Sequence, residues 1–162
     1  MAQHLSQAVE PDPGGAYANF RNSSQVISES ELAEWWAALP STPVHDMIGL
    51  WRGGLFDTGH PFNRRDAGHT WFGKDIRAVD DAFPTVCVNA DQLRYLAPVH
   101  GSMWTILFRG EPTASLIYDD RPVIDHFKTV DADTRLGVMN RPEDRKSDRW
   151  LYFWLERFVE TS

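Results

Sequence analysis

Three side chains that could transfer protons or stabilise charge lie on two segments with strand-like composition. Lys74 lies on the first segment, and Asp125 and His126 lie next to each other on the second. Successive residues of a strand face opposite sides, so Lys74 should share a face with Phe72 and Ile76. A lysine between apolar neighbours either extends outward to solvent or is held inside by an acid. An inward Lys74 would bind a carboxylate or phosphate head group, or polarise a carbonyl.

The pair Asp125-His126 is divided by the same alternation, because neighbours on a regular strand cannot both face one pocket. If Asp125 points inward, desolvation disfavours its charged form unless Lys74 or Arg52 neutralises it. It would then act as a general base or as half of a buried ion pair. If His126 points inward instead, it would serve as a proton shuttle or hydrogen-bond donor near neutral pH. Solvent exposure or purely structural bonding is the alternative for each residue.

Aromatic side chains supply the remaining candidates for ligand contacts. Seven tryptophans and nine phenylalanines raise the aromatic fraction to 12%, which indicates an aromatic core or a cavity lined with rings. The predicted ligand-binding residues are Trp51, Arg52, His60, Phe62, Trp71, Trp104, Tyr118, Phe127, Tyr152 and Trp154. For His60 and Phe62, the alternatives are guarding an entrance and simply forming the turn after the first strand.

The elements that must position these residues are one helix and about eight strands. Ser28 and Glu31 form a capping-box pattern, and Pro40 ends the run, which predicts an amphipathic helix at 29–39 with an apolar face that includes Trp35 and Trp36. This face should pack on the barrel wall, plug one end, or form a dimer or membrane contact. Strands are predicted at 45–56, 69–78, 83–89, 102–109, 113–118, 122–130, 134–139 and 150–159.

Short spacers between these strands imply antiparallel neighbours, and eight such strands predict a mainly β, closed, lipocalin-like barrel with room for one small ligand. Residues 90–101 are expected to form a short helix or lid. Residues 1–25 predict a flexible N-terminal arm, and residues 26–162 a single domain. In the last strand both faces are apolar, as expected between the barrel interior and the helix, so that Tyr152 and Trp154 are candidates for pocket lining.

The run Gly49-Leu50-Trp51-Arg52-Gly53 fits the pattern G-x-W-x-G. Three further blocks follow it in order: 71–74, 117–127 and 130–139. Together they resemble the GXWXG protein family, including its C-terminal domain of unknown function, over about residues 32–159. The resemblance implies a small β-barrel whose apolar interior suits lipids or other hydrophobic ligands, with no agreed enzymatic role. The first block is also similar to the start of lipocalins, where such a Trp helps to close the barrel under an arginine; stacking on a ligand is the alternative for Trp51.

Composition limits the possible partners. A net charge of −7, from 23 acids and 16 bases, argues against a nucleic-acid surface and against anionic membranes. No run approaches the roughly 20 apolar residues of a membrane span, and no signal-peptide core is present, so we expect a cytoplasmic protein without stable membrane insertion. Cys87 is the only cysteine and should be a small buried hydrophobe. Histidine spacings predict no metal site, and no cofactor motif is present.

Two functions remain in competition. The first is a binding protein that holds a lipid or another hydrophobic small molecule in an aromatic-lined barrel pocket. The second is a cofactor-independent enzyme that isomerises, cyclises or hydrates a hydrophobic metabolite in the same pocket. Asp125 or His126 would then move the proton, and Lys74 or Arg52 would stabilise negative charge. A homodimeric module that uses the Trp35-Trp36 face is a third possibility.

Overall fold

The computed structural model describes residues 12–64 and 70–161. Its helices are α1 (Pro13–Arg21), α2 (Glu29–Ala38) and α3 (Pro142–Ser147), with short 3-10 helices η1 (Val44–Met47) and η2 (Pro61–Arg64). Its strands are β1 (Gly49–Leu55), β2 (Thr70–Ala78), β3 (Asp81–Val88), β4 (Arg94–Leu96), β5 (Gly101–Phe108), β6 (Glu111–Tyr118), β7 (Ile124–Asp131), β8 (Thr134–Asn140) and β9 (Leu151–Arg157).

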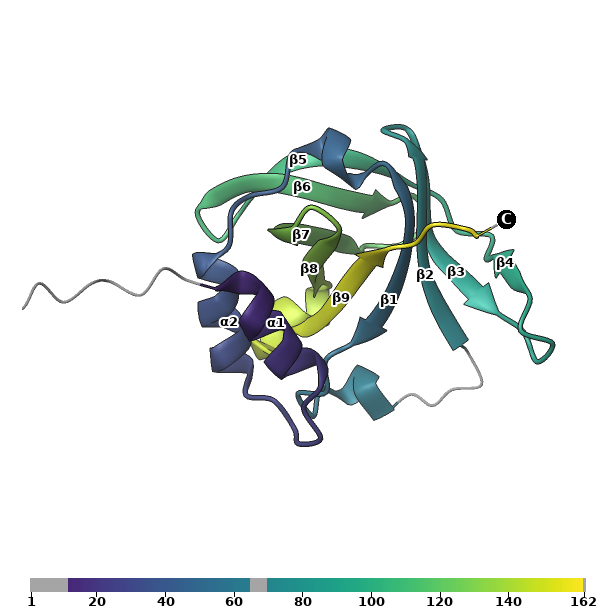
Figure 1. Cartoon of the computed structure of the whole chain (residues 1–162). Helices are drawn as coiled ribbons and strands as arrows, with labels where there is room; N and C mark the ends of the chain where they lie inside the picture. Colours follow the sequence, from purple (N-terminus) through teal and green to yellow (C-terminus); the bar gives the residue numbers. More distant parts are fainter. Residues whose placement is uncertain (1–11, 65–69, 162) are drawn as a thin grey trace, which may run out of the picture.

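Eight strands form a closed antiparallel barrel. The spatial order is β2-β1-β9-β8-β7-β6-β5-β3, and pairing of β2 with β3 closes the ring (Figure 1). The short strand β4 pairs with residues 86–88 of β3, farther along the edge that also pairs with β5, and is not part of the ring. The predicted mainly β, eight-stranded closed barrel is therefore confirmed. Closure satisfies backbone hydrogen bonds that an open sheet would leave at its edges.

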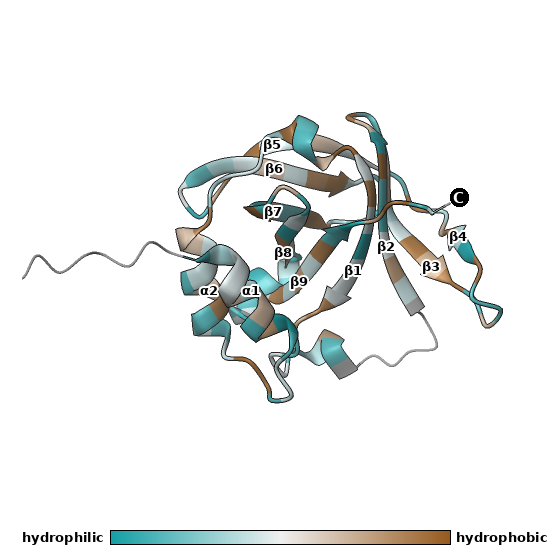
Figure 2. Cartoon of the chain, in the orientation of Figure 1, coloured by the Kyte–Doolittle hydropathy of each residue, from teal (hydrophilic) through white to brown (hydrophobic). Residues whose placement is uncertain are grey.

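Alternation along the strands separates an inner from an outer apolar layer. Figure 2 shows hydrophobic and hydrophilic residues following one another in bands along the strands. In β9, Phe153 and Leu155 belong to the inner cluster, whereas Tyr152 and Trp154 belong to the outer cluster beneath the helices. Both faces of β9 are buried, as the sequence predicts. The prediction that Tyr152 and Trp154 line the barrel interior is wrong. Side chains alternate along β9, and those of Tyr152 and Trp154 point to the outer face of the barrel.

Helix α2 covers the outer layer with its apolar face. Leu32, Trp35 and Trp36 are all buried within the chain. The predicted helix is present, but Ser28 makes no side-chain capping bond to the backbone, and its hydroxyl lies 2.7 Å from that of Ser30 instead. No helix among the residues described is long and apolar enough to cross a membrane.

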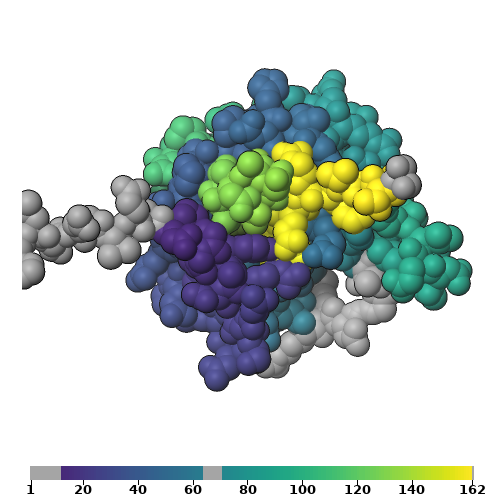
Figure 3. Space-filling view, viewed as in Figure 1, coloured from purple at the N-terminus to yellow at the C-terminus, as the bar shows by residue number. Residues whose placement is uncertain are grey.

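Helix α1 occupies part of the stretch expected to be a flexible arm. Asp12 caps it by accepting a hydrogen bond from the Gly15 amide at 2.9 Å, a contact that composition alone does not reveal. The ring of Phe20 lies 5.1 Å from that of Trp35, and the Tyr17 hydroxyl donates to Glu156 at 2.5 Å. Figure 3 shows the purple residues of α1 beside the green β7–β8 turn and the yellow C-terminal residues. Tertiary contacts with rings thus hold this helix in place.

Three other segments differ from the prediction. Residues 94–96 form the edge strand β4 rather than a helix or lid, because they pair with 86–88 of β3. Residues 44–47 form η1, so the first strand begins at Gly49. Helix α3 was not predicted, since Pro142 and the charged residues after it lack apolar periodicity. The expected start of the second strand at His69 lies outside the described residues.

The G-x-W-x-G segment places Trp51 in the inner apolar cluster. Trp51 is completely buried, and its indole N–H donates to the Met47 carbonyl at 2.9 Å. The guanidinium groups of Arg157 and Arg135 lie 4.3 and 5.0 Å from its ring centroid. Gly49 has a φ of +136°, and a Cβ there would lie 2.7 Å from an Arg157 nitrogen. This arrangement supports the structural role for Trp51, as a ring held under arginines.

Candidate functional site

A polar cluster of Lys74, Tyr118 and Asp125 lies inside the otherwise apolar barrel. Lys74 comes from β2, Tyr118 ends β6, and Asp125 follows the first residue of β7. The Lys74 ammonium lies 2.7 Å from Asp125 Oδ2, and the Tyr118 hydroxyl donates to the same oxygen at 2.8 Å. Lys74 is 2% exposed and Asp125 is fully buried. We call these three residues the interior triad.

Counting hydrogen bonds in the interior triad reveals one unused acceptor. The ammonium of Lys74 has three N–H groups, which reach Asp125, the Tyr118 hydroxyl at 3.2 Å and the Pro84 carbonyl at 3.2 Å. Burial, and then the negative charge of Asp125, raise the pKa of Tyr118 well above its ordinary value, so its hydroxyl keeps the proton that it donates. Asp125 Oδ2 thus accepts two bonds, while buried Oδ1 has no partner among the described residues.

Aromatic rings surround the interior triad. The Lys74 ammonium lies 5.2 Å from the ring centroid of Phe153 and 5.4 Å from that of Trp71. The Phe153 ring in turn makes edge contacts with Trp71 and Phe127 at 5.8 and 6.0 Å. Such rings favour a cation through their negative faces, and they exclude water from the ion pair. The chemistry that remains available here is acceptance of a hydrogen bond by a buried carboxylate.

The structure brings together some of the predicted site residues and separates others. Within the barrel lie Lys74, Asp125, Tyr118, Trp71, Phe127 and Trp51. Outside it lie Arg52, Trp104, His126, Tyr152 and Trp154. Arg52 therefore cannot neutralise Asp125; it pairs at 3.2 Å with Glu156, and its side chain is 49% exposed. Trp104 is 56% exposed, and its indole donates to the Ser102 hydroxyl at 2.8 Å.

His126 faces away from the interior triad, as alternation with Asp125 predicts, and it is buried beneath Phe108. The two rings stack at 3.8 Å with an interplanar angle of 7°. Arg145 donates to Asn140 Oδ1 at 2.7 Å, which leaves the Asn140 amide to donate to His126 Nε2 at 3.0 Å. His126 Nδ1 then donates to the Ser115 hydroxyl at 2.7 Å. Both ring nitrogens are thus engaged in a network that fixes a neutral imidazole.

Stability should depend on this imidazole between pH 4 and 6.5. Burial, followed by the positive charge of Arg109, lowers the pKa of His126 from 6.5 to about 4. Between pH 4 and 6.5, His126 therefore binds a proton in the unfolded chain but not in the folded chain. The His126 contribution is complete above pH 6.5 and falls by about 3 kcal/mol as the pH drops to 4. Urea unfolding across this range should show a shallower pH dependence for His126→Gln, whereas the same change at exposed His45 should leave the slope of the wild type.

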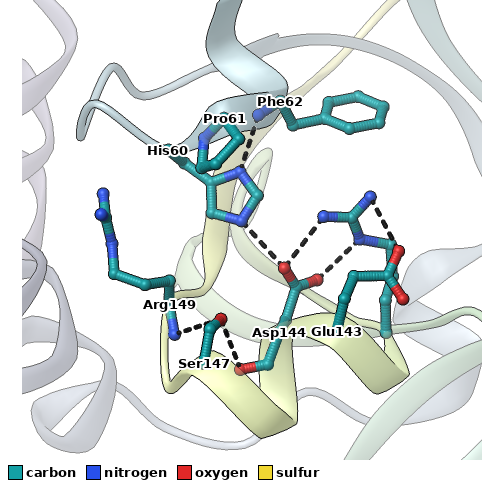
Figure 4. A pocket seen from close by; sticks show the side chains of 8 residues that line it. His60, Pro61, Phe62, Glu143, Asp144, Ser147 and Arg149 are labelled. Atoms are coloured by element: carbon teal, nitrogen blue, oxygen red, sulfur yellow. Dashed lines mark hydrogen bonds and ion pairs between the residues drawn. The ribbon is translucent and has the colours of Figure 1, made fainter.

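His60 and Phe62 line a hollow of about 400 Å³ between η2 and α3 (Figure 4). His60 Nδ1 accepts a bond from the Phe62 amide at 3.0 Å, so its Nε2 donates to Asp144 at 2.8 Å. Arg141 donates to both carboxylate oxygens of Asp144. Burial acts to raise the pKa of Asp144, but the bonds from Arg141 and His60 outweigh it and lower the pKa. This buried cluster joins η2 to α3 and leaves neither His60 nitrogen free for proton transfer.

Sequence patterns did not predict two features of the molecule. The partnership of Tyr118 with Asp125 depends on the β6–β7 turn, which returns the chain so that Leu116 pairs with Asp125. Arg109 and Lys128, described below, face a groove outside the barrel; the only signal was the position of Lys128 two residues after His126, on the same strand face. Within 12–64 and 70–161, no group of three His, Cys, Asp or Glu side chains is placed to hold a metal ion.

Comparisons with known proteins match the chain in two adjacent blocks. The model described as "GXWXG protein" matches residues 34–92, and the model described as "Domain of unknown function (DUF4334)" matches residues 99–157. A crystal structure of a protein from Thermomonospora curvata is 30% identical, with a TM-score of 0.82, and the match covers 92% of this chain and 100% of that chain. No curated protein matches. The chain therefore belongs to the GXWXG protein family.

Proposed function

We propose that the barrel interior binds a neutral hydrophobic molecule through a hydroxyl or N–H group that donates to Asp125. The observation that carries the proposal is Asp125 Oδ1, a buried carboxylate oxygen without a partner among the described residues. Leaving a buried acceptor unpaired costs about 1–3 kcal/mol, and more when the acceptor is charged. A hydrogen-bond donor on a ligand would remove this cost. Trp71, Phe127 and Phe153 would supply the apolar contacts.

The same geometry argues against a fatty acid or phosphate head group at this point. All three N–H groups of Lys74 are committed to Asp125, Tyr118 and Pro84. A second carboxylate would meet Asp125 Oδ1 without a cation or donor to separate the two negative charges. Among lipid-like molecules, alcohols and amides therefore fit better than acids.

Calorimetric titration of the wild-type protein tests this proposal with three probes of similar length. We expect 1-decanol to bind about 10- to 100-fold more tightly than 1-methoxynonane, which lacks the donor, because hydrogen bonds to charged groups contribute about 1.5–3 kcal/mol. Decanoate should bind no better than the ether. Equal affinities for alcohol and ether, or preference for the acid, would refute the proposal without any variant.

Asp125→Asn should then abolish the preference for decanol over the ether, with Asp75→Asn on β2 as the matched control. Asp75 pairs with Arg77 at 3.0 Å outside the interior triad. Retained discrimination in folded Asp125→Asn would place the alcohol elsewhere. If this variant does not fold, the three wild-type titrations still decide.

Acid–base catalysis on a hydrophobic metabolite is the second candidate, and the same oxygen favours it. In that reaction Asp125 Oδ1 would accept the substrate proton, whereas His126 faces the other side of the sheet, where its ring stacks on Phe108. Under this alternative, Asp125→Asn would reduce turnover by about 10²-fold or more. Under simple binding, a ligand that is isolated with the protein from its native host would be released without chemical change. Mass spectrometry of the released ligand would show this.

A further inference from the structure

A groove of about 620 Å³ lies on the outer side of the barrel, between α2, the β5–β6 turn and the start of β9. Its volume lies in the range of small-molecule sites, which is about 300–1,000 Å³. Trp36, Trp150 and Tyr152 supply its aromatic surface, Arg109 and Lys128 supply positive charge, and Glu29, Glu111 and Asp148 supply negative charge. Glu29 is paired with Arg149 at 2.7 Å. Lys128 and Tyr152 project from the face of the sheet opposite to the interior triad. The groove is therefore a site separate from the interior triad.

Two cations flank a single indole in this outer groove. The Arg109 guanidinium lies 5.9 Å from the ring centroid of Trp36, and the Lys128 ammonium lies 5.6 Å from it. Arg109 also lies 5.2 Å from Trp150 and 5.6 Å from Tyr152. Contacts with several rings hold a cation in place without using its hydrogen-bond donors. Both cations are therefore held against aromatic rings.

Most donors of Arg109 remain available. A guanidinium has five N–H groups, and the hydrogen bond from Arg109 to the Tyr152 hydroxyl, at 3.0 Å, uses one of them. In the part of the chain that the structure describes, Arg109 forms no ion pair with a carboxylate. Its backbone φ of +50° lies in the left-handed region, which few non-glycine residues adopt. The turn thus positions an exposed arginine that forms no direct ion pair among the described residues, although Glu29, Glu111 and Asp148 line the same groove.

Lys128 is neutralised by a partner that can be replaced. Its side chain is 1% exposed and donates to the Leu39 carbonyl at 3.0 Å, so the stem is fixed. Its carboxylate partner is Glu111, whose side chain is 52% exposed. A surface carboxylate on a flexible stem gains little from such a contact, because water solvates it almost as well. A ligand carboxylate that also reaches Arg109 would compete effectively with Glu111.

From these contacts we infer that the outer groove binds a small aromatic carboxylate. The ring of the ligand stacks against the partly exposed Trp150, and its carboxylate pairs with Arg109 and, in place of the Glu111 side chain, with Lys128. The planar fork of arginine matches the two oxygens of a carboxylate, and offset stacking of rings adds affinity without new charge. The groove and the interior triad then select opposite head groups, an acid outside and a neutral donor inside.

Calorimetric titration with 1-naphthoate and its neutral analogue 1-naphthamide tests this inference. The wild type should bind naphthoate at least about tenfold more tightly than naphthamide, and Arg109→Met should reduce the naphthoate affinity to that of the amide. Arg77→Met is the matched control, because Arg77 also lies over a ring, 4.7 Å from Phe83, but outside the groove. It should leave naphthoate binding unchanged.

Glu111→Gln provides a second test of opposite sign. Removal of the competing carboxylate should tighten naphthoate binding by about three- to tenfold, while 1-decanol should not displace naphthoate. The inference fails if the amide binds as well as the acid, if Arg109→Met retains full affinity, or if Glu111→Gln weakens binding. Preference for 1-naphthylmethylammonium would instead identify a cation site, in which Arg109 is displaced from the rings.

Discussion

Lys74→Met is expected to lower the free energy of unfolding by about 3–5 kcal/mol, because it leaves the charge of Asp125 buried without a partner. Lys74 and Asp125 are 2% and 0% exposed, and their charged atoms lie 2.7 Å apart. Removal of the ammonium also leaves the Pro84 carbonyl without its donor at 3.2 Å. Urea unfolding followed by tryptophan fluorescence measures the change.

The exposed pair Arg52–Glu156 is the matched control for this experiment. Its side chains are 49% and 32% exposed, so Arg52→Met should cost no more than about 1 kcal/mol. A loss of under 1 kcal/mol for Lys74→Met as well would contradict the buried pair. The double variant Lys74→Met/Asp125→Leu should recover most of the stability, because neither charge is then left alone in the core.

That double variant also separates stability from function. A pair of apolar residues in this position should give a folded barrel, yet the variant should no longer prefer 1-decanol over 1-methoxynonane, because the acceptor is gone. If the preference survives, the alcohol does not contact Asp125. The cycle therefore shows whether the buried pair contributes to ligand recognition or only to the fold.

Gly73→Ala is the second change for which we expect a large effect, with a loss of more than about 4 kcal/mol or failure to fold. A Cβ at residue 73 would lie 1.8 Å from the carbonyl oxygen of Trp51, which is backbone and cannot rotate away. β1 and β2 would have to separate where Arg52 pairs with Gly73, next to Lys74 and the buried Trp51. Thermal unfolding by circular dichroism and near-ultraviolet spectra would report the damage.

Gly14→Ala is the control for Gly73→Ala. Residue 14 lies in α1, and the nearest atom to an added Cβ is an Asp12 oxygen at 3.6 Å, an ordinary contact. Alanine in a helix is favoured over glycine by about 0.5–1 kcal/mol, so this variant should be as stable as the wild type or slightly more stable. A wild-type melting curve for Gly73→Ala would mean that β1 and β2 do not approach each other so closely at this point.

Alternation patterns in the sequence predict much of what the strands do. The period of two residues along 123–130 assigns Asp125 and His126 to different sides of one strand, and the structure places them on opposite faces of the sheet, Asp125 against Lys74 and His126 against Phe108. In 150–155 the same period requires two buried faces, which the barrel and the helices provide. These features follow from local geometry, because a regular strand directs successive side chains to opposite sides. In β2 the expected alternation fails: its register against β3 shifts between Trp71 and Asp75, and Phe72 packs on Phe158 instead of sharing the inner face with Lys74.

The sequence did not predict which face of a strand points into the barrel and which points outward. Tyr152 and Trp154 are as apolar and aromatic as Phe153, so composition could not decide which of them faces the interior. Arg52 and Lys74 were equal candidates to neutralise Asp125, and only the packing of β1 and β2 shows that Lys74 points inward. Helix α1 and strand β4 were missed because contacts with Trp35 and pairing with β3, rather than their own sequences, stabilise them.

The sequence by itself determined the closed antiparallel barrel, the amphipathic helix and the family, since short turns and alternation act between neighbours along the chain. The tertiary structure alone decided which distant groups meet. Lys74 and Asp125 are 51 residues apart, and barrel closure brings them together inside. Arg109 and Lys128 meet Trp36 only because α2 folds back over the outer face. Such contacts depend on the register and curvature of the whole sheet, which no local pattern specifies.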